Sequence, residues 1–237
     1  MSHFDNDKNT SNKLRSLNMK KLNVLAISAA VAGALVSGTA AADLTGNIGL
    51  SNNYMWRGVT QTDDQAAISG GIDYSNKSGI YAGTWVSNVD YGSTASDGSY
   101  EMDLYFGYGG EAGSVAYDVG YIYYAYPLDT DADFSEIYAG VDVANFELDV
   151  ALTVDTDAGG DDANIYASLA YSFDLGNDLS LGLLIGNYAF DDAAATDYSH
   201  YSVALGKGDF SFGLEANDID GDDDMRVVVA WGKEFEL

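Results

Sequence analysis

The stretch SVAYDVGYIYYAYP, residues 114–127, decides between the possible folds because its side chains alternate strictly. Side chains of a β-strand point to opposite faces in turn. One face carries Val115, Tyr117, Val119, Tyr121 and Tyr123, and the other carries Ala116, Asp118, Gly120, Ile122 and Tyr124. A soluble protein would turn the first face toward a core and place Lys, Glu and Arg on the second. Here the second face carries a single acid and no Lys, Glu or Arg, so the apolar face is a candidate for contact with lipid.

The composition excludes several classes of protein. The chain has 237 residues with no Cys, one Pro, 27 Gly and 18 Tyr, and its net charge is −27. Disulfides therefore cannot stabilise it, and nothing in it could neutralise the phosphates of a nucleic acid. The length suits one large β domain or two small ones.

The first 42 residues differ from the rest. Residues 1–18 have neither apolar content nor periodicity, and we expect them to be an extension that arises from the choice of start site, with translation beginning at Met19. Residues 19–42 read as a secretory signal peptide, with basic Lys20 and Lys21, an apolar stretch from Leu22 to Val36, and an Ala40-Ala41-Ala42 cleavage site. A membrane anchor is the rival interpretation. Removing residues 1–42 takes away five of the 10 basic and two of the 37 acidic residues, which leaves a domain of 43–237 with a charge near −30.

This domain consists of alternating segments, each long enough to supply the roughly 9–11 residues with which a tilted strand crosses a bilayer. We count twelve, at 43–57, 64–76, 79–91, 98–110, 113–126, 132–144, 146–156, 162–174, 178–190, 197–207, 209–219 and 225–237. Tight connections such as NKSG (76–79) and KGD (207–209) alternate with longer, mostly acidic ones such as DTDAGGDD (155–162) and DIDGDDD (218–224). This asymmetry is typical of an outer-membrane barrel. The sequence therefore predicts an all-β, transmembrane, up-and-down antiparallel β-barrel of about twelve strands.

The two faces of the predicted strands differ in chemistry. Apolar side chains occupy the face assigned to lipid, including Ile68 and Ile72, Leu104 and Phe106, and the row from Phe146 to Val154. The inverse arrangement would leave a lumen too wide for apolar side chains to fill in a barrel of this size. The inward face carries the predicted pore-lining residues Asp73, Glu101, Asp103, Asp118, Glu136, Asp142, Glu147, Asp149 and Glu215, with Arg57 and Arg226 as the cations.

Aromatic residues gather where a membrane boundary is expected. At the tight-turn ends we predict a girdle of Tyr74, Phe106, Tyr108, Tyr117, Phe146, Tyr171, Phe173, Phe210, Phe212 and Phe235, and at the other boundary a sparser set of Tyr54, Trp56, Tyr123 and Tyr201. The third strand allows two assignments, with either Ile80, Ala82 and Val86 or Tyr81, Trp85 and Val89 toward lipid. The last strand, RVVVAWGKEFEL (226–237), resembles the terminal strand that the outer-membrane assembly machinery reads, although it ends in Leu237 where an aromatic is usual.

Residues 44–92 contain three distinctive motifs, Y-x-W-R-G-V-T-Q-T at 54–62, GGIDY at 70–74 and GIYAGTWVSNVD at 79–90. With these motifs the segment resembles the opening of the TorF family of proposed porins, also known as a conserved bacterial family of unknown function. The resemblance implies an outer-membrane barrel and passage of small solutes, and it carries no binding residues to transfer.

The expected function is a porin-like channel in the bacterial outer membrane for passive diffusion of small solutes, preferring cations or passing neutral solutes. The alternative is a non-conducting barrel with a structural or adhesion role, since inward Tyr124, Tyr138, Tyr166 and Tyr188 could close the lumen. A soluble, acidic, calcium-stabilised β-protein is a third possibility.

Arg57, a lone cation among carboxylates, could tie strands together or narrow a pore.

Other kinds of site have weaker support. DIDGDDD (218–224) fails the EF-hand pattern because Gly221 is fourth and Val229 stands at the twelfth position. Loose Ca²⁺ or Mg²⁺ bridging between acidic loops and lipopolysaccharide stays open, and we expect no cofactor. We expect no enzymatic activity, because His200 and Ser202 on one strand face do not by themselves bring a base to a nucleophile. The expected partners are outer-membrane lipid, lipopolysaccharide, the assembly machinery and a small solute, with no nucleic acid.

Overall fold

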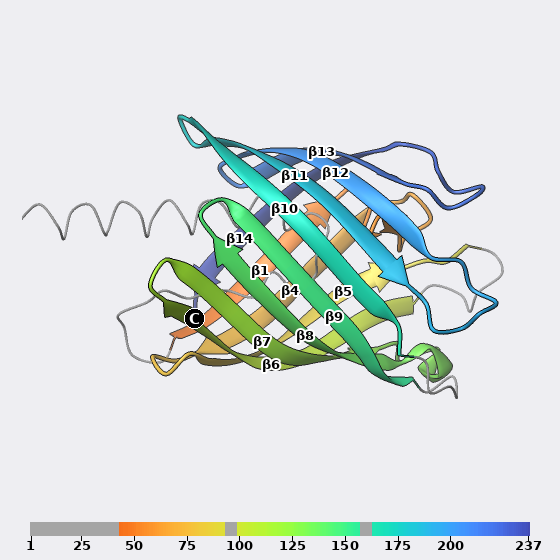
Figure 1. Cartoon of the computed structure of the whole chain (residues 1–237), viewed down its shortest axis with the longest axis horizontal. Coiled ribbons are helices and arrows are strands. Elements are labelled where there is room, and N and C mark those ends of the chain that lie inside the picture. The colour runs from red at the N-terminus through yellow and green to blue at the C-terminus, as the bar shows by residue number, and fades with distance from the viewer. Residues whose placement is uncertain (1–42, 93–98, 157–162) are drawn as a thin grey trace, which may run out of the picture.

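The computed structural model describes residues 43–92, 99–156 and 163–237, and that part of the chain is built mainly of β-strands (Figure 1). The predicted extension (1–18) and signal peptide (19–42) lie outside the described residues. So do the centres of two predicted loops, 93–98 and 157–162. No helix in the described ranges is long and apolar enough to cross a membrane.

Twelve strands in the described ranges close an antiparallel barrel, which confirms the predicted fold class and strand number. They are β1 (Asp43–Ser51), β4 (Ala67–Ser75), β5 (Ile80–Val89), β6 (Ser99–Ala112), β7 (Val115–Ala125), β8 (Phe134–Val143), β9 (Phe146–Thr156), β10 (Ile165–Gly176), β11 (Leu179–Ala189), β12 (Tyr198–Lys207), β13 (Phe210–Asn217) and β14 (Arg226–Glu236). Between β1 and β4 the short strands β2 (Met55–Trp56) and β3 (Val59–Thr60) form a separate hairpin. The 3-10 helix η1 (Thr130–Ala132) lies between β7 and β8.

The barrel closes where its first strand meets its last. β1 pairs with β4 on one side and with β14 on the other, in a register that runs from Thr45 opposite Glu236 to Ser51 opposite Ala230. Beyond that register the backbone N–H of Leu237 donates to the carbonyl of Leu44 at 3.0 Å. Closure removes the free sheet edge, so that the backbone groups of the wall are paired within the sheet, as a bilayer requires.

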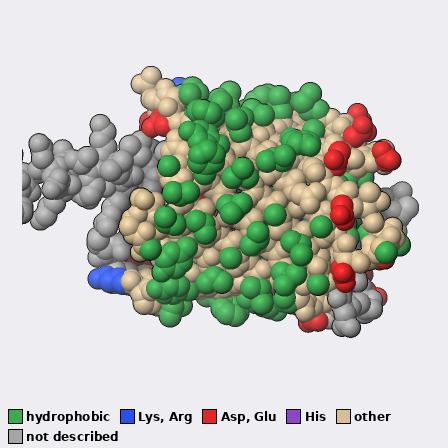
Figure 2. Space-filling model, in the orientation of Figure 1, with side chains coloured by type: hydrophobic (Ala, Val, Ile, Leu, Met, Phe, Trp, Pro, Cys, Tyr) green, Lys and Arg blue, Asp and Glu red, His purple; other side chains and the backbone are tan. Residues whose placement is uncertain are grey.

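The connections differ at the two ends of the barrel, as predicted from the sequence. Tight turns and the C-terminus lie at the left end in Figure 1, and the longer loops lie at the right end. The tight turns use residues that tolerate a positive φ, such as Asn177 and Asp178 with φ of 55° and 58° between β10 and β11. Such turns match the twist of the strands that they join. Figure 2 shows acidic side chains gathered at the loop end.

The outer surface of the barrel is apolar along the strands (Figure 2). Large side chains on this face are exposed and follow the predicted alternation, among them Ile68, Ile72, Leu104, Phe106, Ile137, Val141, Leu148, Val150, Leu152, Ile185, Val203, Val227 and Val229. The third predicted strand, β5, takes one of its two allowed assignments. Ile80 and Val86 face outward and are exposed, whereas Tyr81 and Val89 face inward and are buried.

The aromatic side chains of the predicted tight-turn girdle face outward, and neighbours on adjacent strands contact one another. Phe106 lies 5.5 Å from Tyr121, and Phe146 lies 4.6 Å from Tyr171, measured between ring centroids. At the opposite boundary the prediction is wrong for Tyr54 and Trp56. The first strand ends at Ser51 instead of residue 57, and both residues lie in the connection that follows it, which folds into the barrel.

Substitution on the outward face tests whether hydrocarbon surrounds the barrel. Val150 lies in the middle of β9 and Val154 near its loop end, and both are exposed on the outward face. We expect Val150→Arg to lower the free energy of unfolding in lipid vesicles by about 2–4 kcal/mol, and Val154→Arg by about 0–1 kcal/mol, because the cost of a charge depends on its depth in the bilayer. Urea titration of both variants measures the difference. Equal losses at the two positions would contradict a hydrocarbon environment.

Candidate functional site

Residues 52–66, which we name the luminal loop, connect β1 to β4 and fold into the lumen of the barrel. The tip is the β2–β3 hairpin, where Trp56 pairs with Val59 and the turn residues Arg57 and Gly58 both have positive φ, 51° and 79°. A two-residue turn with two positive φ values suits a hairpin and favours Gly at its second position. The hairpin is enclosed by the wall, since the exposed fraction is 1% for Met55 and 6% for Arg57.

Polar side chains of the loop fix its shape. The hydroxyl of Thr60 donates to the Asn53 side-chain oxygen at 2.7 Å, and the Asn53 amide donates to Asp64 at 2.7 Å. The backbone N–H of Gln61 donates to the carbonyl of Tyr54 at 2.7 Å, and the Gln61 carbonyl accepts from Asp90 N–H at 2.8 Å. The segment Tyr54–Thr62, which carried the family resemblance, is therefore the inserted hairpin with its supports.

Arg57 is the centre of the site. Its two terminal nitrogens, Nη1 and Nη2, donate to the two carboxylate oxygens of Glu136 on β8 at 2.8 and 2.7 Å. The guanidinium carbon lies 4.2 Å from the ring centroid of Trp56, 4.2 Å from that of Tyr166 on β10, and 5.0 Å from that of Tyr188 on β11. These distances are those of cation–π contacts. One cation from the loop is thus enclosed by one carboxylate and three rings.

The charge state of Arg57 follows from these neighbours. Burial acts to lower the pKa of its guanidinium, but the Glu136 carboxylate and its hydrogen bonds outweigh burial, so the pKa lies above its ordinary value. Arg57 is therefore permanently positive, and Glu136 is the carboxylate that neutralises it. A register irregularity between Ser135 and Glu136 against β9 lies directly at this carboxylate, a placement typical of bulges that aim a side chain into a site.

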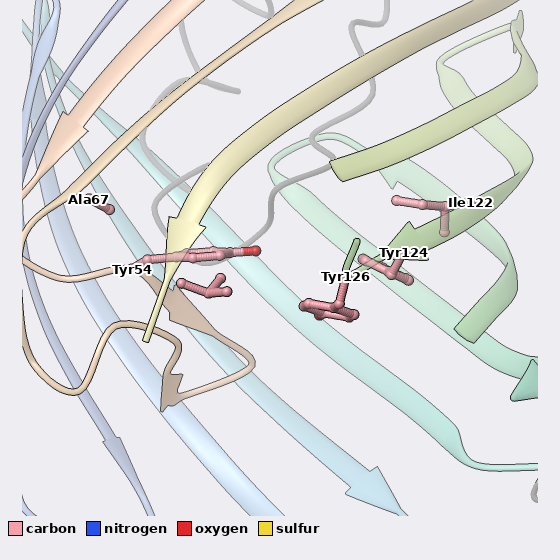
Figure 3. Close-up of a cluster of buried hydrophobic side chains, with 6 residues drawn as sticks. Tyr54, Ala67, Ile122, Tyr124 and Tyr126 are labelled. Atoms are coloured by element: carbon pink, nitrogen blue, oxygen red, sulfur yellow. The ribbon is translucent and has the colours of Figure 1, made fainter. Parts of the chain in front are cut away.

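An aromatic cluster holds the loop against the wall formed by β4 to β8. Its buried members come from the loop, β4, β5, β7 and the residue after β7: Tyr54, Ala67, Val89, Ile122, Tyr124 and Tyr126. Figure 3 shows Tyr54 reaching from the loop toward Tyr124 and Tyr126. Tyr54 meets Trp85 edge-on at 5.3 Å, and Trp56 meets the rings of Tyr124 at 6.1 Å and Phe134 at 6.0 Å.

The hairpin tip also contacts the opposite wall. The side-chain amide of Asn217 on β13 donates to the Gly58 carbonyl at 2.8 Å. His200 on β12, with 0% of its surface exposed, lies beneath Gly58 so closely that a Cβ on Gly58 would be 2.3 Å from the His200 Cβ. His200 Nε2 contacts the Tyr166 hydroxyl at 3.0 Å. The histidine thus supports the loop and the ring beside Arg57.

The predicted inward carboxylates face the interior in two groups. The group under the luminal loop is Glu101, Asp103 and Glu136, with exposed fractions of 2%, 0% and 1%. Glu101 accepts hydrogen bonds from the Tyr54 and Tyr126 hydroxyls at 2.7 and 2.6 Å. Both carboxylate oxygens of Asp103 lack a hydrogen-bond partner in the described part of the chain. Glu136 is the member of this group that forms an ion pair with Arg57.

The second group lies nearer the tight turns and is partly buried: Asp73, Asp118, Asp142, Glu147 and Asp149. The Tyr81 hydroxyl donates to Asp118 at 2.7 Å, and the Asn47 amide donates to Asp73 at 3.0 Å. Asp142 and Glu147 stand directly opposite one another on β8 and β9. Within the described ranges none of the five carboxylates forms an ion pair with Lys or Arg.

The remaining predicted residues lie at the loop end. Arg226, the first residue of β14, donates to Asp64 at 2.7 Å and also to Asp222. Glu215 is 1% exposed and faces Arg226 across the β13–β14 register. Among the described residues no group of three or more His, Asp or Glu side chains is arranged to hold a metal ion.

Sequence reasoning missed the luminal loop, although one signal was present. The first predicted segment, 43–57, is longer than a strand needs to be to cross a bilayer. The part of this segment that lies beyond the end of β1, residues 52–57, contains the residues that turn into the lumen. The contributions of Asn217 and of His200 to the loop could not be predicted, because both depend on where the loop docks.

Comparisons with solved structures agree with this geometry. A chain solved in work on the in-meso crystallization of membrane proteins is 9% identical, with a TM-score of 0.52, and the match covers 82% of this chain and 84% of that one. The KdgM porin is 8% identical, with a TM-score of 0.50, and the match covers 81% and 99%. These likenesses show the fold. No curated protein sequence matches this chain.

The closed barrel, the apolar outer face, and the contrast between tight turns and long loops together identify a bacterial outer-membrane β-barrel of porin-like fold. A family model described as a bacterial protein of unknown function, Gcw_chp, matches residues 36–234. The chain therefore belongs to the Gcw_chp family.

Proposed function

We propose that this barrel is a channel for passive diffusion of small solutes and that it prefers cations. The observation that carries the proposal is the group of five inward carboxylates, Asp73, Asp118, Asp142, Glu147 and Asp149, none of them ion-paired with Lys or Arg in the described ranges. A surface of one charge sign inside low-dielectric walls concentrates ions of the opposite sign.

The luminal loop is the constriction in this proposal. It crosses the interior from the β5–β8 wall, where Glu136 and the aromatic cluster hold it, to the β12–β13 wall, where Asn217 holds Gly58. A solute must therefore pass beside the hairpin. Arg226 and Glu215 lie at the loop end, and the buried Glu101 and Asp103 lie beneath the luminal loop.

A non-conducting barrel is the second candidate, and the burial of the hairpin favours it. Met55 is 1% exposed, and Trp56 packs on rings of both walls, Tyr124 and Tyr188. A loop packed this closely could close the lumen, which would leave a structural or adhesive role for the barrel.

Several further features of the proposal concern assembly and surroundings. The signal peptide at 19–42 delivers the chain to the periplasm, and β14 is the strand that the assembly machinery recognises. Lipopolysaccharide contacts the acidic loops, with divalent cations between them. The proposal gives the barrel no enzymatic role. The resemblance to the TorF family of proposed porins is consistent with a channel.

Neutralising part of the carboxylate group tests the selectivity. We expect the triple variant Asp142→Asn, Glu147→Gln and Asp149→Asn to shift the reversal potential in asymmetric KCl toward zero, because the field that attracts cations is weakened. The control neutralises three exposed loop acids, Asp220, Asp223 and Asp224, to Asn. An equal shift in the control, or none in the luminal variant, would place selectivity elsewhere.

Removing the hairpin separates the two candidate functions. We expect replacement of Tyr54–Thr62 by a short Gly-Ser linker to raise the single-channel conductance severalfold in planar bilayers, with a heat-shift gel confirming that the barrel is folded. A conducting wild type with a larger conductance in the variant supports a channel with a constriction. A silent wild type and a conducting variant support the plugged barrel. Unchanged conductance contradicts the constriction.

A further inference from the structure

Most of the groups that contact the Arg57 guanidinium belong to the barrel wall. Glu136 comes from β8, Tyr166 from β10 and Tyr188 from β11, so the carboxylate and two of the three rings around the guanidinium are independent of the loop. Only the third ring, that of Trp56, belongs to the luminal loop together with Arg57. If the hairpin moved away, these three wall residues would remain together.

The chemistry of these wall residues fits a guanidinium group more closely than other cations. Glu136 accepts two parallel N–H bonds, at 2.8 and 2.7 Å, which a planar fork of donors provides and a single ammonium does not. The rings of Tyr166 and Tyr188 lie 4.2 and 5.0 Å from the central carbon. A guanidinium stacks on aromatic faces because it is planar and weakly hydrated.

Other wall residues hold the site in this shape. The Tyr124 hydroxyl donates to Glu136 Oε2 at 3.3 Å, and His200 Nε2 contacts the Tyr166 hydroxyl at 3.0 Å. Tyr188 meets Tyr166 and Tyr198 edge-on, with centroids 6.3 and 5.9 Å apart. A site whose members are fixed by their neighbours loses little side-chain freedom when a ligand binds.

Two further carboxylates, Asp103 and Glu101, lie near the site. Asp103 lies opposite Tyr124 in the β6–β7 register, is fully buried, and has no hydrogen-bond partner in the described part of the chain for either oxygen. Glu101 is two residues away on β6. Of the three carboxylates only Glu136 is ion-paired with Arg57 in the described ranges, so it is the acceptor on which a competing guanidinium depends.

We propose that Glu136, Tyr166 and Tyr188 form a binding site for guanidinium-bearing solutes, which Arg57 occupies in this structure as a tethered ligand. Such solutes compete with Arg57, and their binding displaces the hairpin. This proposal names a solute class for the proposed channel. Only the passage of such solutes through the barrel rests on the proposed function. Binding itself is measurable on the purified barrel whether or not the barrel conducts.

The test removes the Arg57 side chain from the site and measures whether free methylguanidinium binds there. Arg57→Gly removes the tethered group without backbone strain, because φ is 51° at this position. We expect calorimetric titration of the detergent-solubilised barrel with millimolar methylguanidinium to show binding to Arg57→Gly. Adding Glu136→Gln should weaken that binding by at least about tenfold, because it removes the charge from the paired acceptor. The wild type should bind far more weakly than Arg57→Gly, since its own arginine competes.

Two controls make the result specific. Arg226→Ala removes an arginine that is also ion-paired, with Asp64 and Asp222, and should bind no better than the wild type. Tetramethylammonium has the same charge without N–H donors and should bind Arg57→Gly more weakly than methylguanidinium. Heat-shift gels and circular dichroism establish that each variant is folded. A folded Arg57→Gly barrel that binds methylguanidinium no better than the wild type overturns the site, as does binding that survives Glu136→Gln unchanged.

Conductance tests the solute class separately. If the barrel conducts, methylguanidinium should change the wild-type current in planar bilayers at concentrations where tetramethylammonium does not. Binding to Arg57→Gly without conduction in any variant would refute the channel and leave the site intact. Conduction without binding would refute the site and leave the channel intact.

Discussion

The whole structure depends on pairing every backbone N–H and C=O group of the sheet while its apolar side chains face outward. Hydrocarbon offers no partner to an unpaired N–H or C=O group, so a sheet in a bilayer is stable only when it has no edge. Pairing of β1 with β14 meets this requirement, and Leu237 extends it with a bond to Leu44. The side-chain alternation then follows, because a strand with one face in lipid has its other face in the lumen.

The lumen of the barrel is filled by a connection between two strands. A twelve-stranded wall lined with small residues and acids cannot fill its own lumen, and here a connection between strands supplies the missing bulk. The luminal loop brings aromatic rings to one wall and a polar tip to the other, with Arg57 between them. Its cation offsets one of the three carboxylates beneath it. If the barrel conducts as proposed, its stability and its conductance depend on the same residues, because the contacts that anchor the loop also determine how much space remains in the lumen.

The sequence predicted the barrel well because period-two alternation is a local signal. Each strand shows which of its residues face outward, as Leu148, Val150 and Leu152 do, and turn composition marks where it ends. The sequence of β5 is ambiguous because both of its faces carry apolar residues. Its pairing with β4 and β6 determines that Tyr81 and Val89 face the lumen. The carboxylates alternate with the outward apolar side chains for the same local reason.

The contacts of the candidate site were not predictable in this way. Arg57 meets Glu136 across 79 positions of sequence, and Asn217 meets Gly58 across 159. No periodicity connects such residues. Only the length of the first predicted segment indicated that residues 52–57 leave the wall.

The position of the luminal loop in the chain has a consequence for biogenesis. The loop directly follows β1, which is also the strand that receives β14 when the cylinder seals. Pairing of β1 with β4 is local, whereas its pairing with β14 spans nearly the whole domain and carries the larger entropic cost, so we expect it to form last. In that order the luminal loop is attached to the strand at the open edge before the barrel closes, which couples packing of the interior to closure of the sheet.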